Sequence, residues 1–131
     1  MKTAVIVIAV LVVLGALAGG FYLIGPPAEE RARRLDARRE ADLQGLRLAV
    51  DLYWTRTGRL PTSLDELHAA AGTGVYARDP QSERPYPYRV KSGEAYELCA
   101  EFARASERPG DFWSHGPGTQ CFEITAKRIR P

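Results

Sequence analysis

The chain has 131 residues, with 18 Lys and Arg against 16 Asp and Glu, which gives a formal net charge of +2. Charged residues make up 26% of the chain and the two signs are interspersed, so no basic patch indicates a nucleic-acid partner. The chain has no internal repeat and no low-complexity tract. The roughly 100 residues behind its apolar N-terminal segment suffice for one modest core, which predicts a single small domain.

The N-terminal segment is strongly apolar, because residues 3–28 form a run of 26 residues without a charge. As a helix that rises about 1.5 Å per residue, this run would span roughly 39 Å, whereas the hydrocarbon core of a bilayer is roughly 30 Å thick. The sequence therefore predicts a transmembrane anchor over residues 1–28, surrounded by membrane lipid. Any binding or catalytic site would then lie in residues 29–131.

The same segment also has features of a secretory signal peptide. Lys2, the apolar stretch and the small-residue triplet 16–18 match an export signal, and cleavage after Ala18 would release the domain. However, the apolar run continues beyond this triplet, which is longer than export requires. Phe21 and Tyr22 would suit the membrane interface, where amphipathic rings are enriched. We expect a retained single-pass anchor, with the cleaved and secreted domain as the alternative.

Two arguments about membrane orientation oppose each other. The positive-inside rule favours a cytoplasmic domain, because residues 31–39 contain five arginines. Acidic residues alternate with these arginines, so the stretch 29–42 is expected to be solvated and close to the headgroups. A cytoplasmic-facing protein whose arginine-rich helix contacts lipid phosphates is therefore an alternative to an extracytoplasmic domain. The arginines are Arg31, Arg33, Arg34, Arg38 and Arg39.

A long helix is expected over residues 29–57. It begins after two prolines, which a helix start tolerates, and its apolar residues recur every three or four positions. Leu35 and Arg39 continue this stripe upstream, and Gly58 ends the helix. The predicted inward residues are Leu43, Leu46, Val50, Tyr53 and Thr57.

A short second helix is expected over residues 63–71. Ser63 and Glu66 have the spacing of a capping box, as do Thr62 and Asp65. The residues expected to face inward and then to close this helix are Leu64, Leu67, Gly72 and Gly74.

The hydrophobic period changes to two beyond residue 80. Residues 85–91 and 95–103 alternate apolar and polar around Ser92-Gly93, which predicts a β-hairpin with one apolar face. A last strand is expected over 120–125. The domain is therefore predicted to be α+β, with a long helix laid across a small antiparallel sheet.

The alternation also predicts how the two cysteines lie. If Phe102 and Phe122 face the core, Cys99 and Cys121 both point to the opposite face, where same-face neighbours are roughly 5 Å apart. A bridge would contribute on the order of 3 kcal/mol and would imply a periplasmic or extracellular domain, since disulfides persist in oxidising compartments. Two unconnected thiols are the alternative. No zinc spacing is present, so no metal site is expected.

Two segments carry a resemblance to a known family. Residues 49–67, AVDLYWTRTGRLPTSLDEL, and the later Asp79-Pro80 with 85–88, PYPY, resemble type II secretion pseudopilins and related type IV pilin-like proteins of bacteria. The resemblance implies an apolar helix that continues into an amphipathic one packed on a small sheet. It also implies an inner-membrane location, a periplasmic domain, and protein partners in a secretion or cell-envelope assembly.

The chain departs from this family at its processing site. Prepilins have a basic leader that ends in Gly before the apolar helix, and a glutamate at the fifth position of that helix. Here Gly20-Phe21 echoes the cleavage site only after the apolar run, and Gly25 stands where the glutamate would be. These departures favour an anchor over a filament subunit.

The loop over residues 104–118 holds the best cluster of reactive side chains. A nucleophile needs a base within hydrogen-bond reach and a third group that holds the base. The spacing does not require such an arrangement, so we expect no catalytic site and no cofactor. The cluster consists of Asp111, Ser114, His115 and Cys121.

The same loop could instead form an interaction surface from Phe112, Trp113 and His115, since aromatic side chains provide contact area. The alternative is that Trp113 fills the edge of the core.

Overall fold

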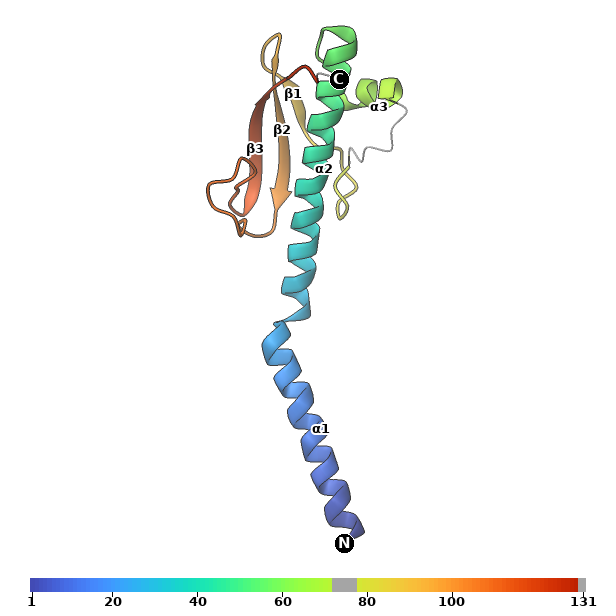
Figure 1. Cartoon of the computed structure of the whole chain (residues 1–131), viewed down its shortest axis with the longest axis vertical. Helices are drawn as coiled ribbons and strands as arrows, with labels where there is room; N and C mark the ends of the chain where they lie inside the picture. The colour runs from blue at the N-terminus through green and yellow to red at the C-terminus, as the bar shows by residue number, and fades with distance from the viewer. Residues whose placement is uncertain (72–77, 130–131) are drawn as a thin grey trace. The chain divides into compact units, whose positions relative to one another are not determined.

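The computed structural model describes residues 1–71 and 78–129, and its secondary structure confirms the α+β class (Figure 1). The contacts divide the chain into two compact units, residues 1–32 and 33–131, and each unit is described by itself. Gly72 and Gly74, which were expected to close the short helix, lie outside the described residues. The elements in chain order are α1 (Lys2–Ile24), α2 (Pro27–Thr57), α3 (Leu64–Ala71), β1 (Tyr88–Val90), β2 (Ala95–Phe102) and β3 (Gly118–Thr125).

The first helix ends at a glycine and two prolines. Gly25 has a φ of 76°, a conformation that glycine adopts without steric cost, and its N–H donates to the Phe21 carbonyl at 3.1 Å. Pro26 lacks an N–H to continue the ladder, whereas Pro27 suits the first position of the next helix. The local sequence therefore separates α1 from α2.

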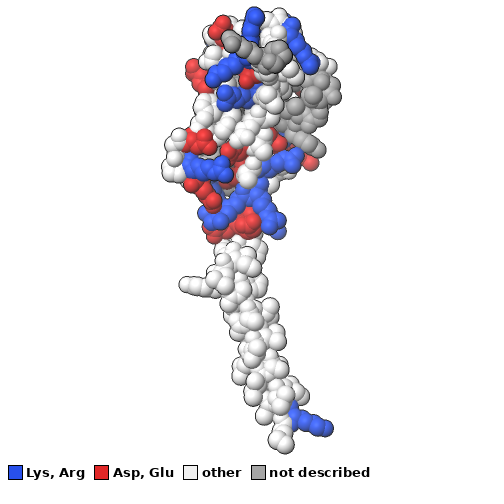
Figure 2. Space-filling view, in the orientation of Figure 1, with Lys and Arg blue, Asp and Glu red and all other residues white. Residues whose placement is uncertain are grey.

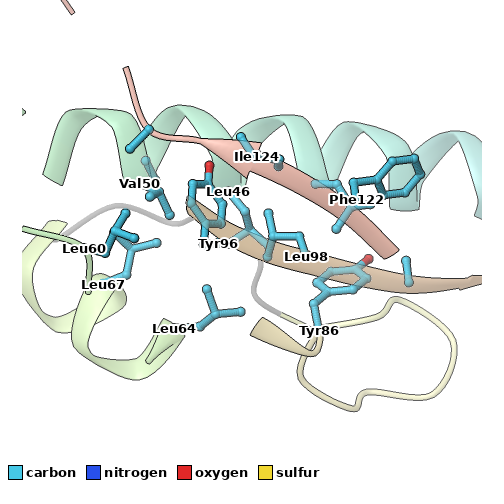
Figure 3. Close-up of a cluster of buried hydrophobic side chains, with 14 of the residues drawn as sticks. Leu46, Val50, Leu60, Leu64, Leu67, Tyr86, Tyr96, Leu98, Phe122 and Ile124 are labelled. Carbon is cyan, nitrogen blue, oxygen red and sulfur yellow. The ribbon is translucent and has the colours of Figure 1, made fainter. Parts of the chain in front are cut away.

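The inward stripe of α2 packs against one face of the sheet (Figure 3). Leu43 and Val50 are fully buried, and Leu46 and Tyr53 are almost so, which confirms most of the predicted stripe. Thr57 is an exception: it is exposed, and its hydroxyl donates to the Tyr53 carbonyl at 2.9 Å. The helix ends where predicted, because Gly58 takes a φ of 73°.

The Glu66 carboxylate of the short helix α3 forms hydrogen bonds to the last turns of α2 and to the segment that connects the two helices. Ser63 Oγ accepts the Glu66 N–H at 3.1 Å, as a capping residue should, while the Glu66 carboxylate accepts the Thr62 N–H at 2.7 Å. Glu66 also accepts the Tyr53 hydroxyl at 2.6 Å and the Arg59 guanidinium at 2.6 Å. These hydrogen bonds, with that from Tyr53 the strongest, hold the pKa of Glu66 far below its usual value.

The sheet has the order β1-β2-β3 and both pairs are antiparallel. Leu98 lies in the central strand opposite Tyr88 on one side and Phe122 on the other. The first strand is confined to three residues, since the prolines at 85 and 87 cannot donate to a ladder. The core between α2 and the sheet is completed by Tyr86, Tyr96, Leu98, Phe102, Phe122 and Ile124 (Figure 3).

Buried carboxylates of α2 bind the segments that flank the strands. Asp36 accepts the N–H groups of Ala103 at 3.0 Å and Arg104 at 2.9 Å, just after β2. Asp51 accepts the Lys127 N–H at 2.9 Å, just after β3. Because a buried carboxylate needs hydrogen-bond donors, these contacts stabilise the placement of the sheet on the helix.

The expectation of a fully solvated stretch over residues 29–42 is therefore wrong in part. Asp36, Arg39 and Asp42 are only 7%, 5% and 8% exposed. Their charges are paired or hydrogen-bonded inside the domain, which is what allows them to be buried.

Candidate functional site

The surface of α1 is the first candidate site. None of its 23 residues is buried, and its large apolar side chains are more than half exposed, as for Ile6 at 62%, Leu11 at 63% and Phe21 at 66%. The segment is long and apolar enough to cross a membrane, by length and composition. The face of α1 that Figure 2 shows is without charge apart from one basic side chain at its N-terminal end, and Lys2 is the charged residue of this helix.

A second candidate is an ionic cluster around Arg39. The guanidinium donates to Asp36 at 2.9 Å, to Gln81 at 2.9 Å and to both carboxylate oxygens of Asp79. Asp79 also accepts the N–H groups of Gln81 and Ser82 at 2.9 and 2.8 Å. Burial opposes ionisation of Asp79, but these donors outweigh it and lower its pKa to about 2.

The Arg39 cluster lines an open pocket of about 360 Å³ between α2, the turn at residues 79–82 and the end of β2. Because the polar groups of Arg39 and Asp79 already bind each other, the arrangement fixes the turn to the helix. Its geometry is that of an internal ion pair, in which each charge compensates the other.

Two of the three residues predicted to form a contact surface in the loop between β2 and β3 are buried. Trp113 is 7% exposed and its ring packs 4.9 Å from that of Phe122, so it fills the edge of the core as the alternative interpretation expected. His115 is 8% exposed and stacks on Phe102, with ring centroids 3.5 Å apart. Of the three predicted contact residues, Phe112 remains available, at 49% exposed.

Phe112 is held in place by its neighbours. The Arg47 guanidinium of α2 lies 5.3 Å from the centre of its ring, within the range of a cation–π contact. The ring also meets Trp113 edge-on at 5.0 Å. A half-exposed aromatic ring therefore lies beside a basic side chain.

The cluster considered for catalysis makes local contacts. Ser114 Oγ lies 3.3 Å from Ser106 Oγ, and His115 Nδ1 lies 3.3 Å from the Gly116 carbonyl oxygen. The Asp111 carboxylate accepts the Phe112 N–H at 2.8 Å, and Cys121 is bonded to Cys99. These interactions shape the loop and the sheet.

The predicted disulfide between Cys99 and Cys121 is present. The two residues are directly opposed in the register of β2 and β3, with Cα atoms 4.0 Å apart, on the sheet face opposite the core. The Cys99 N–H donates at 3.0 Å to the Pro87 carbonyl on the other side, so the pair is of the non-hydrogen-bonded type that brings side chains closest. Cys99 is buried and Cys121 is exposed.

The polar residues that bind α2 to the rest of the domain were not identified from the sequence. Arg39 was placed in the apolar stripe, since it lies four residues before Leu43. Its acidic partners were not predicted. Asp79 contacts it from 40 residues further along the chain. No periodicity connects positions so far apart. The available signal for a buried ion pair was the presence of a charged residue within an apolar stripe.

No family model, no curated protein and no solved structure significantly matches the chain. The architecture itself is informative, because a long N-terminal helix that is apolar at its start precedes a small antiparallel sheet that carries a disulfide. This arrangement is pilin-like.

Proposed function

We propose that this chain is a single-pass membrane protein that presents a small pilin-like domain outside the cytoplasm. In this role it serves as a non-enzymatic structural or interaction component of a secretion or cell-envelope assembly. The observation that carries the proposal is the apolar surface of α1, of which no residue is buried, in a chain whose other unit holds a disulfide.

The exposed surface of α1 supports the anchor. At about 1.5 Å per residue its 23 residues span roughly 34 Å, enough for the roughly 30 Å core of a bilayer. Soluble monomers rarely expose a contiguous apolar surface of this size, because its contact with water is unfavourable. A bilayer would cover it along its whole length.

The disulfide supports an extracytoplasmic domain, because cytosolic reductants keep most thiols reduced. The lipid-contacting alternative needs arginines that are free to reach phosphates. Arg39 is buried among Asp36 and Asp79, and Arg38 lies 3.1 Å from Asp42. These ion pairs leave fewer cationic groups for a lipid surface.

The interaction role rests on Phe112 and Arg47. A half-exposed aromatic ring next to an arginine provides the two residue types that are enriched at protein interfaces. We propose this pair as the point at which the domain contacts a partner protein.

Reporter fusions at the C-terminus test the membrane orientation. Alkaline phosphatase should be active and green fluorescent protein dark, since the phosphatase requires the disulfides that form after export. A matched chain without residues 3–24 should reverse both signals. A silent phosphatase with a bright fluorescent protein on the full chain would contradict the proposal.

The mass of the membrane-extracted chain separates an anchor from a cleaved signal. Retention predicts the full mass and resistance to alkaline extraction. The variant Ala16→Leu/Ala18→Leu, which removes the small residues that cleavage needs, should then behave like the parent. A parent shortened by 18 residues beside a full-length variant would favour the secreted alternative.

A further inference from the structure

The sheet face opposite the core brings two cysteines and a glutamate together. Glu97 and Cys99 are two residues apart on β2, and Cys121 lies opposite Cys99 on β3. One carboxylate oxygen of Glu97 and the two sulfurs all lie within 4.8 Å of one another. Two sulfur ligands and one oxygen ligand on neighbouring positions of a rigid sheet are a ligand set suited to zinc.

We propose that reduction of the Cys99–Cys121 disulfide converts this face into a site for Zn²⁺ or another soft divalent cation, with both thiolates and the Glu97 carboxylate as ligands. In the oxidised chain the sulfurs are bonded to each other and do not act as thiolate ligands. The chain therefore has two alternative states at one place: a covalent bridge and a metal bridge. The compartment decides which state is populated, because an oxidising compartment keeps the bridge and a reducing one opens it.

The electrostatics of the face favour a cation. Glu97 and Glu123 are directly opposed in the register, and like charges in that position repel each other. Lys91 and Arg89 lie 3.4 and 4.0 Å from the Glu97 carboxylate, so these four side chains together carry no net formal charge. Two further negative charges arise when both thiols ionise, and a divalent cation would balance them.

The geometry needs little rearrangement. A tetrahedral zinc ion holds two thiolate sulfurs roughly 3.8 Å apart, given Zn–S distances of about 2.3 Å. Directly opposed side chains on adjacent antiparallel strands reach this separation by rotation about χ1. Six further register pairs between Tyr96–Ile124 and Phe102–Gly118 surround the cysteine pair and maintain its alignment. Cys121 is exposed, so a reductant and an ion can approach from solvent.

The conversion has two balanced steps. A dithiol reductant exchanges with the bridge: the S–S bond breaks, two electrons and two protons pass to the cysteines, and the reductant becomes a disulfide. Zn²⁺ then binds both sulfurs and displaces the two thiol protons. Because the ion binds only the reduced chain, free zinc at 100 times its dissociation constant should shift the exchange equilibrium toward the dithiol about 100-fold.

The test uses the full chain in detergent micelles, reduced with a phosphine that is then removed under anaerobic conditions. Titration with Cd²⁺, followed by thiolate-to-cadmium charge-transfer absorption, should show one ion bound per reduced chain. An excess of Zn²⁺ should compete with it, and the oxidised chain should give no such absorption. Equal binding by the oxidised and reduced chains would overturn the proposal, as would loss of the β-sheet circular dichroism on reduction.

Two matched variants test the carboxylate without altering the cysteines. Glu97→Gln should weaken binding by at least about tenfold, since a charged ligand is lost. Glu101→Gln removes an exposed glutamate from the same strand and the same face, two residues beyond Cys99, and should bind like the parent. Unchanged affinity in Glu97→Gln, or an equal loss in both variants, would overturn the assignment of Glu97.

Discussion

The Tyr86 hydroxyl donates a hydrogen bond of 2.9 Å to the Asp42 carboxylate, 44 residues earlier on α2. Both side chains are buried, at 3% and 8% exposed. Burial, followed by the hydrogen bond to Asp42, raises the pKa of Tyr86 well above its usual value, so the phenol keeps its proton throughout the physiological range. The pair joins the segment that leads into β1 to the middle of α2.

Tyr86→Phe should therefore lower the free energy of unfolding by about 1–3 kcal/mol, because it leaves a buried carboxylate without one of its donors. Denaturant unfolding of the full chain in micelles, followed by near-ultraviolet circular dichroism, measures this change. Asp42→Asn provides the matched partner for a double-mutant cycle. The two effects should be non-additive, and strict additivity would show that the contact contributes nothing.

Acid should destabilise the domain through Asp79. Its pKa is lowered from an ordinary value of 3.8 to about 2, so its contribution to stability is fully present above about pH 4 and is lost as the pH falls toward 2. Asp79→Asn should flatten this part of the profile of unfolding free energy against pH. Asp65→Asn, at an exposed position of α3, is the control for loss of a negative charge and should retain the parent's slope.

Loss of the disulfide should change both the free energy of unfolding and the number of thiols that can be alkylated. Cys99→Ala/Cys121→Ala opens a loop with a sequence separation of 22 residues, which should cost about 3 kcal/mol of unfolding free energy. Alkylation and mass spectrometry of the denatured parent should find two modified thiols after reduction and none before. A reductant should destabilise the parent and leave the double variant unchanged.

Two glycines of the helical region should respond in opposite directions to alanine. Gly58 has a φ of 73°, so Gly58→Ala should cost about 1 kcal/mol. Gly45 lies within α2 and a Cβ there would meet nothing within 4 Å, so Gly45→Ala should add about 0.5–1 kcal/mol. Midpoints of thermal unfolding measure both, and a shift of the same sign in both variants would contradict this account.

Substitutions of the two aromatic residues Phe112 and Trp113 should have different effects on stability. Trp113→Ala should cost about 3–5 kcal/mol, as expected for a large buried side chain. Phe112→Ala should change stability by about 0.5 kcal/mol, since its ring is half exposed. If Phe112 contacts a partner, photocrosslinking from that position in membranes should give a specific adduct that Arg47→Ala weakens.

Features with a local period could be predicted from the sequence. Leu43, Leu46 and Val50 recur at helical spacing, and Tyr96 and Leu98 alternate with polar neighbours, so both faces of the core were identified. The same alternation predicted the cysteine bridge, because the period of a strand decides which side chains share a face.

Features that depend on distant partners could not be predicted. Asp36 and Asp51 resemble solvated helix residues until the backbone N–H groups at 103, 104 and 127 are placed beside them. The loop that holds Trp113 has no periodicity, so its burial depends on the position of Phe122. Contacts of this kind follow from the tertiary structure.

Three buried carboxylates of α2 also determine how the domain would bear a mechanical load. Asp36, Asp42 and Asp51 bind the rest of the domain at successive points along the helix. A pull on the N-terminal end of α2 acts along the helix axis and so loads all three contacts together in shear, instead of opening them one after another. The covalent link between β2 and β3 prevents the last strand from peeling away under the same force. A domain that is pulled through such a helix can transmit tension without unfolding first.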